Sequence, residues 1–113
     1  MKKLTTFALI AMLASQAFAH SNVDTTKPEN GATVSEVPSE INFNFADDIR
    51  LTKVSMIHQE ADSVTLDLGD HTSFGREFTL PIQSMGKGSY RIEWRGLGAD
   101  GHAMRGEFTF TVD

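Results

Sequence analysis

Apolar and polar residues alternate with a period of two along most of the chain after residue 40. The segment Ile41-Asn42-Phe43-Asn44-Phe45 places its three apolar side chains on one side of an extended backbone. Such alternation is typical of a β-strand with one buried face. The pattern recurs weakly at Val54 and Met56, and clearly at residues 64–68, 78–80, 90–95 and 107–112. The sequence therefore predicts a series of half-buried strands.

No window of a dozen residues after the first nineteen has the 3.6-residue apolar spacing of a helix, so we expect single helical turns at most. Residues 20–40 combine scattered valines with prolines and an Asn-Gly pair, which indicates strands and turns. Strands at a spacing of roughly 8–12 residues predict an all-β fold, either an antiparallel sandwich or a small Greek-key barrel. The alternating aromatic residues, Trp94 included, are expected to form its core, whereas Met104 could face the core or a site.

The first nineteen residues have the features of a secretory signal peptide. Lys2 and Lys3 precede an apolar run from Leu4 to Ala14, and Ala17-Phe18-Ala19 matches the small-x-small cleavage pattern. A retained membrane anchor is the alternative, but the apolar run is short for a bilayer span. We predict a cleaved signal over residues 1–19, a domain over residues 20–113 that does not insert into a membrane, and a periplasmic location.

Composition restricts the chemistry of the predicted 94-residue domain. The chain has no cysteine, which excludes disulfides, thiolate metal sites and blue-copper electron transfer. Without Lys2 and Lys3 it has eight basic and 15 acidic side chains, a net charge of −7. Such a domain lacks the basic surface that a general nucleic-acid binder needs. Any metal must be held by nitrogen and oxygen donors or by methionine.

Two segments could supply those donors. Cleavage after Ala19 would leave His20 at the N-terminus, where its α-amino group and imidazole can chelate one ion. Asp100-Gly101-His102 lies between two predicted strands, and a glycine there lets a carboxylate and an imidazole face the same point. Three nitrogens and one carboxylate oxygen suit Cu(II) better than structural zinc or calcium. His58 and His71 are expected to be surface or hydrogen-bonded residues.

The sequence resembles the CopC/PcoC family of periplasmic copper-binding proteins over nearly the whole predicted domain. The matching segments are His20, Lys27-Pro28-Glu29-Asn30-Gly31-Ala32, Pro38 before residues 41–45, Gly88 to Arg95, Asp100-Gly101-His102 and Gly106 to Val112. The resemblance implies a cupredoxin-like, Ig-like β-sandwich or barrel of about seven strands. It also implies Cu(II) binding by the amine and imidazole of His20 with Asp100 and His102, the residues that the donor argument selected.

The resemblance suggests further features. Asp47 matches an acidic residue associated with the family's copper site, and we expect it beside the ligands rather than on the metal. Ala103 stands where the family often has proline. Some members have a methionine-rich Cu(I) site, for which this chain offers only Met56 near His58. Soft thioether ligands select Cu(I), so one methionine argues against such a site.

The leading hypothesis is a monomeric periplasmic Cu(II) carrier for copper resistance and homeostasis. Its partners would be the copper ion and an inner-membrane transporter of the CopD type or other periplasmic copper proteins. One alternative is a copper oxidase or monooxygenase that uses the same N-terminal histidine chemistry, although Asp100 would then occupy a position that oxygen needs. The other is a metal-independent exported β-sandwich that serves as an interaction domain.

Overall fold

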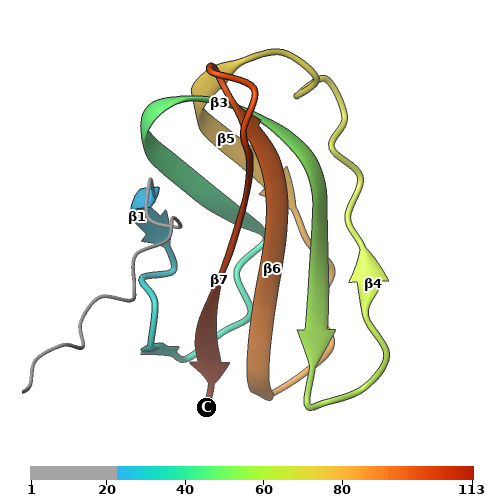
Figure 1. Ribbon diagram of the computed structural model, residues 1–113. Helices are drawn as coiled ribbons and strands as arrows, with labels where there is room; N and C mark the ends of the chain where they lie inside the picture. Colours follow the sequence, from blue (N-terminus) through green and yellow to red (C-terminus); the bar gives the residue numbers. More distant parts are fainter. Residues whose placement is uncertain (1–22) are drawn as a thin grey trace, which may run out of the picture.

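The computed structural model describes residues 23–113, and these form seven strands without a helix. In chain order the strands are β1 (Val23–Lys27), β2 (Ala32–Val34), β3 (Glu40–His58), β4 (Val64–Thr65), β5 (Gly75–Pro81), β6 (Gly88–Gly98) and β7 (Ala103–Val112). They fold into a sandwich of two layers (Figure 1). The predicted all-β sandwich of about seven strands is confirmed.

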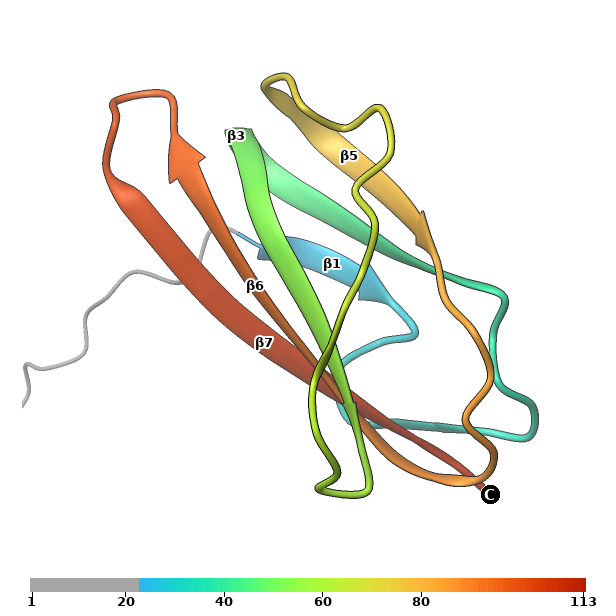
Figure 2. The ribbon, with the colours of Figure 1, turned by 90° about the vertical axis from the view of Figure 1, so that its right-hand side faces the viewer.

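The strand β3 belongs to both layers. Its first half pairs antiparallel with β1 on one side and with β5 on the other. After a register irregularity between Asn44 and Ile49, its second half pairs with β6 and briefly with β4. Figure 2 shows the two halves diverging into separate layers. The sequence pattern indicated two separate strands here, and the structure joins them into one.

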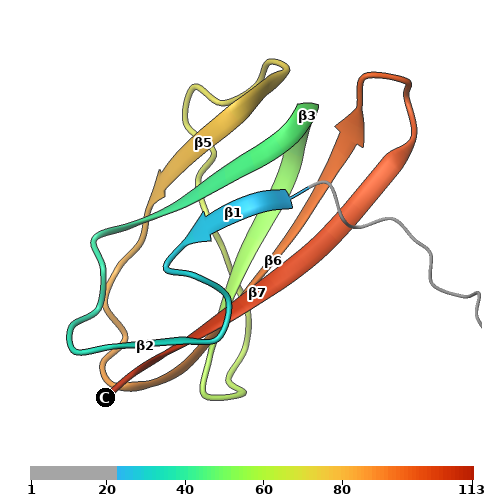
Figure 3. The same cartoon turned by 90° about the vertical axis from the view of Figure 1, so that its left-hand side faces the viewer.

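The hairpin β6–β7 completes the second layer. Its two strands pair antiparallel from Gly88 with Val112 to Leu97 with Ala103, and β2 runs parallel to the end of β7. β1 lies across from this hairpin in the other layer (Figure 3). The loop at residues 99–102 therefore sits at the tip of a long, fully paired hairpin.

The alternating apolar residues form one core between the layers, as predicted. Trp94 is 2% exposed, and its ring meets the rings of Phe43 and Phe45 edge to face with centroids 6.5 and 5.1 Å apart. Tyr90 is also buried, and its hydroxyl donates to the carbonyl of Gly86 at 2.6 Å. Met104 is partly buried and packs against this core.

The prediction of a strand over residues 64–68 is wrong in its extent. β4 contains only Val64 and Thr65, both exposed, while Leu66 turns inward and is buried. Beyond it, the carboxylate of Asp67 accepts a hydrogen bond from the amide of Gly69 at 2.9 Å, and Gly69 has a φ of 59°. This side-chain-capped turn competes with the ladder and ends the strand early.

Gly106 is required by the packing of Trp94. A methyl group on Gly106 would lie 2.8 Å from Nε1 of that indole, its cross-strand neighbour. We expect Gly106→Ala to lower the free energy of unfolding by about 1–3 kcal/mol through overpacking. Chemical denaturation followed by Trp94 fluorescence measures this change in the free energy of unfolding.

Gly75→Ala is the matched control, because its methyl group would meet Phe78 at an ordinary 3.7 Å. We expect the control to unfold within about 0.5 kcal/mol of the natural protein. Equal destabilisation by both substitutions would contradict the role assigned to Gly106.

Candidate metal centre

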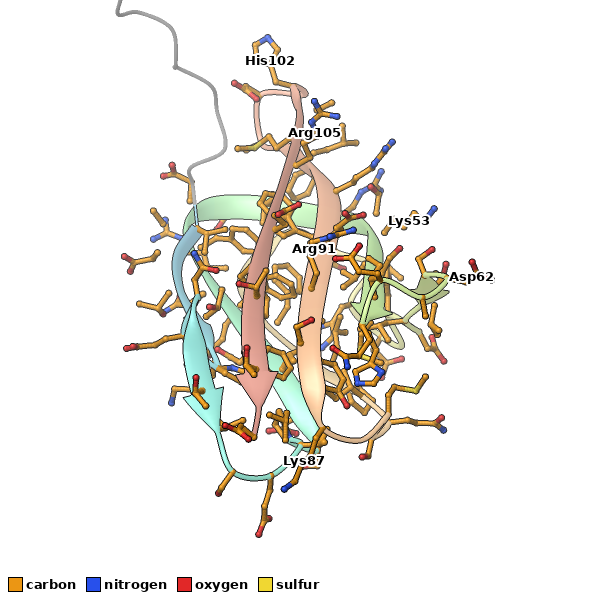
Figure 4. All side chains as sticks on the ribbon, turned by 90° about the horizontal axis from the view of Figure 1, so that it is seen from below. Lys53, Asp62, Lys87, Arg91, His102 and Arg105 are labelled. Atoms are coloured by element: carbon orange, nitrogen blue, oxygen red, sulfur yellow. The ribbon has the colours of Figure 1, made fainter. Side chains whose placement is uncertain are left out.

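The loop between β6 and β7 is a tight turn closed by backbone hydrogen bonds. The amide of Gly98 donates to the carbonyl oxygen of His102, and the amide of Gly101 donates to the carbonyl oxygen of Gly98, each at 2.9 Å. Gly101 has a φ of 87°, in the left-handed region that favours glycine. The turn holds Asp100 and His102 on either side of this glycine, with His102 at the outermost point of the hairpin (Figure 4).

Asp100 and His102 contact each other directly. One carboxylate oxygen, Oδ2, lies 2.9 Å from the ring nitrogen Nδ1 of His102, and the other accepts the His102 amide hydrogen at 3.0 Å. The two side chains are 68% and 84% exposed, respectively. The structure thus brings the two predicted site residues together at the surface, but facing one another rather than a common external point.

This contact shifts both pKa values in the directions of an ion pair. The hydrogen bond from the His102 ring, followed by that from its amide, lowers the pKa of Asp100. The hydrogen bond to Asp100, followed by its negative charge, raises the pKa of His102. Both effects favour the charged forms. The ion pair is therefore fully formed at pH values between the pKa of Asp100 and the pKa of His102. It weakens as the pH rises through the pKa of His102, and also as the pH falls through the pKa of Asp100.

The geometry leaves Nε2 of His102 free of the contact with Asp100. A carboxylate on Nδ1 fixes the ring and its tautomer, an arrangement that commonly orients metal-binding histidines. For Asp100 itself to bind the same ion, the hydrogen bond between the two side chains would have to open. Within residues 23–113, no group of three or more histidine or acidic side chains is placed to hold a metal ion.

The structure describes one of the two other predicted site residues. His20 falls outside the described residues. Asp47 is exposed on β3, at the irregularity where that strand passes from one layer to the other. It lies two residues after Phe45, whose cross-strand partner is Val23, the first residue of β1.

His58 and His71 take part in the fold. Nε2 of His58 lies 2.8 Å from the carbonyl oxygen of Lys87, and its ring packs on Tyr90 at 4.6 Å. Nε2 of His71 lies 3.0 Å from the carbonyl oxygen of Thr79. These are the hydrogen-bonded roles expected for both. Met56 is buried in the core and offers no exposed thioether beside His58.

A comparison with protein families decides the identity. The model described as the CopC domain matches residues 23–113. The chain belongs to the CopC family. This confirms the resemblance drawn from the sequence. The match spans the residues that the structure describes, 23–113.

Known proteins are similar over most of their length. Copper resistance protein C of Escherichia coli is 26% identical over 121 residues, covering 98% of this chain and 95% of that protein. The crystal structure of CopC from Methylosinus trichosporium OB3b matches with a TM-score of 0.69 and 26% identity, covering 83% of this chain and 94% of that chain.

Selenomethionine PcoC, a copper resistance protein from Escherichia coli, matches with a TM-score of 0.59 and 21% identity, over 80% of this chain and 98% of that one. This last likeness concerns the fold alone. In residues 23–113 of this CopC-family chain, no helix is long and apolar enough to cross a membrane.

The interaction between Asp100 and His102 predicts a measurable titration. Replacing Asp100 by asparagine removes the negative charge and the ionised acceptor, so the pKa of His102 should fall toward its ordinary value of about 6.5. Nitrogen and carbon chemical shifts of the His102 ring, followed against pH by NMR, measure the change.

Asp62→Asn is the matched control, because it removes one exposed carboxylate from the loop after β3. It should leave the titration of His102 in place. An Asp100→Asn variant whose His102 titrates as in the natural protein would show that the two side chains do not interact in solution.

Proposed function

We propose that this CopC-family protein is a periplasmic Cu(II) carrier that serves copper resistance and homeostasis. The observation that carries the proposal is the exposed pair of Asp100 and His102 at the tip of a fully paired hairpin. Residues 1–19 are removed on export, and His20 becomes the N-terminus. Its α-amino nitrogen and imidazole bind Cu(II) together with Asp100 and His102, and Asp47 lies beside these ligands.

The donor chemistry supports copper as the cargo. His102 contributes an imidazole nitrogen and Asp100 a carboxylate, whereas His20 would add two further nitrogens. A set of three nitrogens and one oxygen without sulfur suits the tetragonal geometry of Cu(II). The name of the Escherichia coli relative, copper resistance protein C, supports the same metal.

The position of β1 supports the contribution of His20. Val23 lines a cleft together with Gly106 and Glu107 of β7, and β7 begins directly after His102. An extended segment of three residues covers at most about 10 Å. His20, three residues before Val23, can therefore reach the part of β7 near Gly106, on the strand that follows the loop of Asp100 and His102.

The exposure of the pair favours a carrier over an enzyme. Both side chains lie open to water at a loop tip. Such a position allows an ion to be exchanged with another protein, whereas oxygen activation needs an open coordination position on the metal, which Asp100 would fill in the proposed site. The ion is handed to an inner-membrane copper transporter of the CopD type or to another periplasmic copper protein.

The proposal predicts that copper binding depends on a free amine at His20. Gly-Ser inserted between Ala19 and His20 displaces the α-amino group from the chelate, so the Cu(II) affinity should fall by orders of magnitude. Protein exported by a bacterial host is purified, its N-terminus is determined by mass spectrometry, and Cu(II) is titrated against a competing chelator with EPR of the loaded form.

His102→Ala and Asp100→Ala test the loop in the same assay. Each should lower the affinity toward that of any peptide with an N-terminal histidine, whereas Asp62→Ala should not. Unchanged affinity in the extended protein would rule out the chelate at His20. Unchanged affinity in both loop variants would rule out Asp100 and His102 as ligands.

A further inference from the structure

Three basic side chains stand in one row across the outer face of the second layer. Lys53 of β3 is the cross-strand partner of Arg95 of β6, and Arg95 is the partner of Arg105 of β7. Their neighbours Val54 and Trp94 point into the core, so the three basic residues point outward. Figure 4 labels Lys53 and Arg105 around β6 and β7, with His102 beyond them at the loop.

This row lies in a groove rather than on a flat surface. The groove has a volume of about 660 Å³ and is lined by the three basic residues together with Ser55, Ser63, Glu93, Trp94, Ala103, Met104, Gly106 and Glu107. The segment that leads into β4 borders it at Ser63. Two hydroxyl groups therefore accompany the three cations.

The row is unfavourable for the isolated fold. Like charges placed directly opposite one another on neighbouring strands destabilise a sheet. Between residues 23 and 113, no ion pair or hydrogen bond involves the side chain of Lys53, Arg95 or Arg105. Glu93, the nearest acid on β6, instead pairs with Arg91 at 3.1 Å. Departures from local sheet chemistry of this kind occur at functional surfaces.

The positive charges of the groove contrast with the negative net charge of the whole molecule. The chain carries a net charge of −5, and the predicted exported form −7. A polyanion is repelled by such a molecule as a whole, so only a local positive region can hold it. The three cations of the groove outnumber its two glutamates and supply that region.

We propose that this groove is a docking site for an acidic, extended segment of a partner protein. Neighbouring strands are about 4.8 Å apart, so the row spans roughly 10 Å. Carboxylates at alternate positions of an extended peptide are about 7 Å apart and can each reach one or two of the cations. The exposed hydroxyl of Ser63 can donate to the same carboxylates.

The hollow shape and the two glutamates argue against a lipid surface. Attraction to anionic membranes generally needs four to eight basic residues on an accessible face, whereas Glu93 and Glu107 line this groove too. An inserted peptide can avoid these carboxylates, but a flat charged surface cannot.

The groove adjoins the loop of the candidate metal centre. Ala103 and Met104, which directly follow His102, line it. A partner segment held here would lie next to Asp100 and His102. The docking site itself does not depend on copper, so it is tested on the metal-free protein.

The experiment uses the exported protein, freed of metal by EDTA, and a short fluorescein-labelled peptide of alternating aspartate and serine. The same peptide with asparagine in place of aspartate is the matched probe. At low ionic strength the acidic peptide should bind and the asparagine peptide should not. Amide NMR shifts should change around Lys53, Arg95 and Arg105.

The triple variant Lys53→Gln, Arg95→Gln and Arg105→Gln should bind the acidic peptide about tenfold or more weakly. The matched control, Lys27→Gln, Arg76→Gln and Lys87→Gln, makes the same change in net charge away from the groove and should retain binding. Thermal unfolding checks that both variants are folded, and the NMR shifts of the natural protein locate the site without any substitution. Copper affinity should be the same in the groove variant and the natural protein, which separates this proposal from the copper site.

Three results would overturn the proposal. Equal loss of binding in both triple variants would show an effect of total charge only. Groove-dependent binding of phosphatidylglycerol vesicles or inorganic phosphate, without binding of the peptide, would identify a different ligand. Self-association of the natural protein in light scattering, abolished in the groove variant, would make a second copy of this chain the occupant.

Discussion

The bend in β3 is the constraint on which the architecture depends. One strand pairs with β1 and β5 before the bend and with β4 and β6 after it. Because both halves turn apolar side chains toward the same interior, from Ile41 to Met56, the bend closes the two layers on a common core. A straight strand of this length would leave one half without a facing layer.

The rigidity of the candidate site follows from that closure. β6 is held against the second half of β3 by a ladder with one register shift, between Leu51 and Lys53, and β7 is held against β6 by a continuous ladder that reaches almost to the loop. Trp94 anchors the hairpin in the core by packing on two phenylalanines of β3. Only residues 99–102 extend beyond this support, and their own backbone hydrogen bonds fix the turn. The exposed side chains of Asp100 and His102 are therefore positioned by the buried residues of the hairpin that carries their loop.

Sequence patterns predicted the fold where burial determines structure. The alternating apolar positions alone predicted strands at β3, β5, β6 and β7 and an aromatic core between them, because each apolar face of a strand has to be buried against another. The apolar spacing wrongly predicted a strand over residues 66–68. Asp67 and Gly69 form a local turn there, and apolar spacing does not reveal such a turn. The proximity of Asp100 and His102 was predictable from the glycine between them. Their mutual hydrogen bond was not, because two residues that both suit a metal also suit each other. The row of Lys53, Arg95 and Arg105 was also missed, because recognising it requires the register of three strands.

The bond between Asp100 and His102 bears on how an ion would bind and leave. While the carboxylate holds Nδ1, only Nε2 faces outward, and recruiting Asp100 as a ligand exchanges one favourable contact for another. The charged pair also keeps a proton on His102 that a metal must displace. Each of these features opposes the binding of copper by the loop alone and reduces the affinity that two exposed donors could give. In the proposed site, the amine and imidazole of His20 would therefore supply the donors that the loop alone lacks.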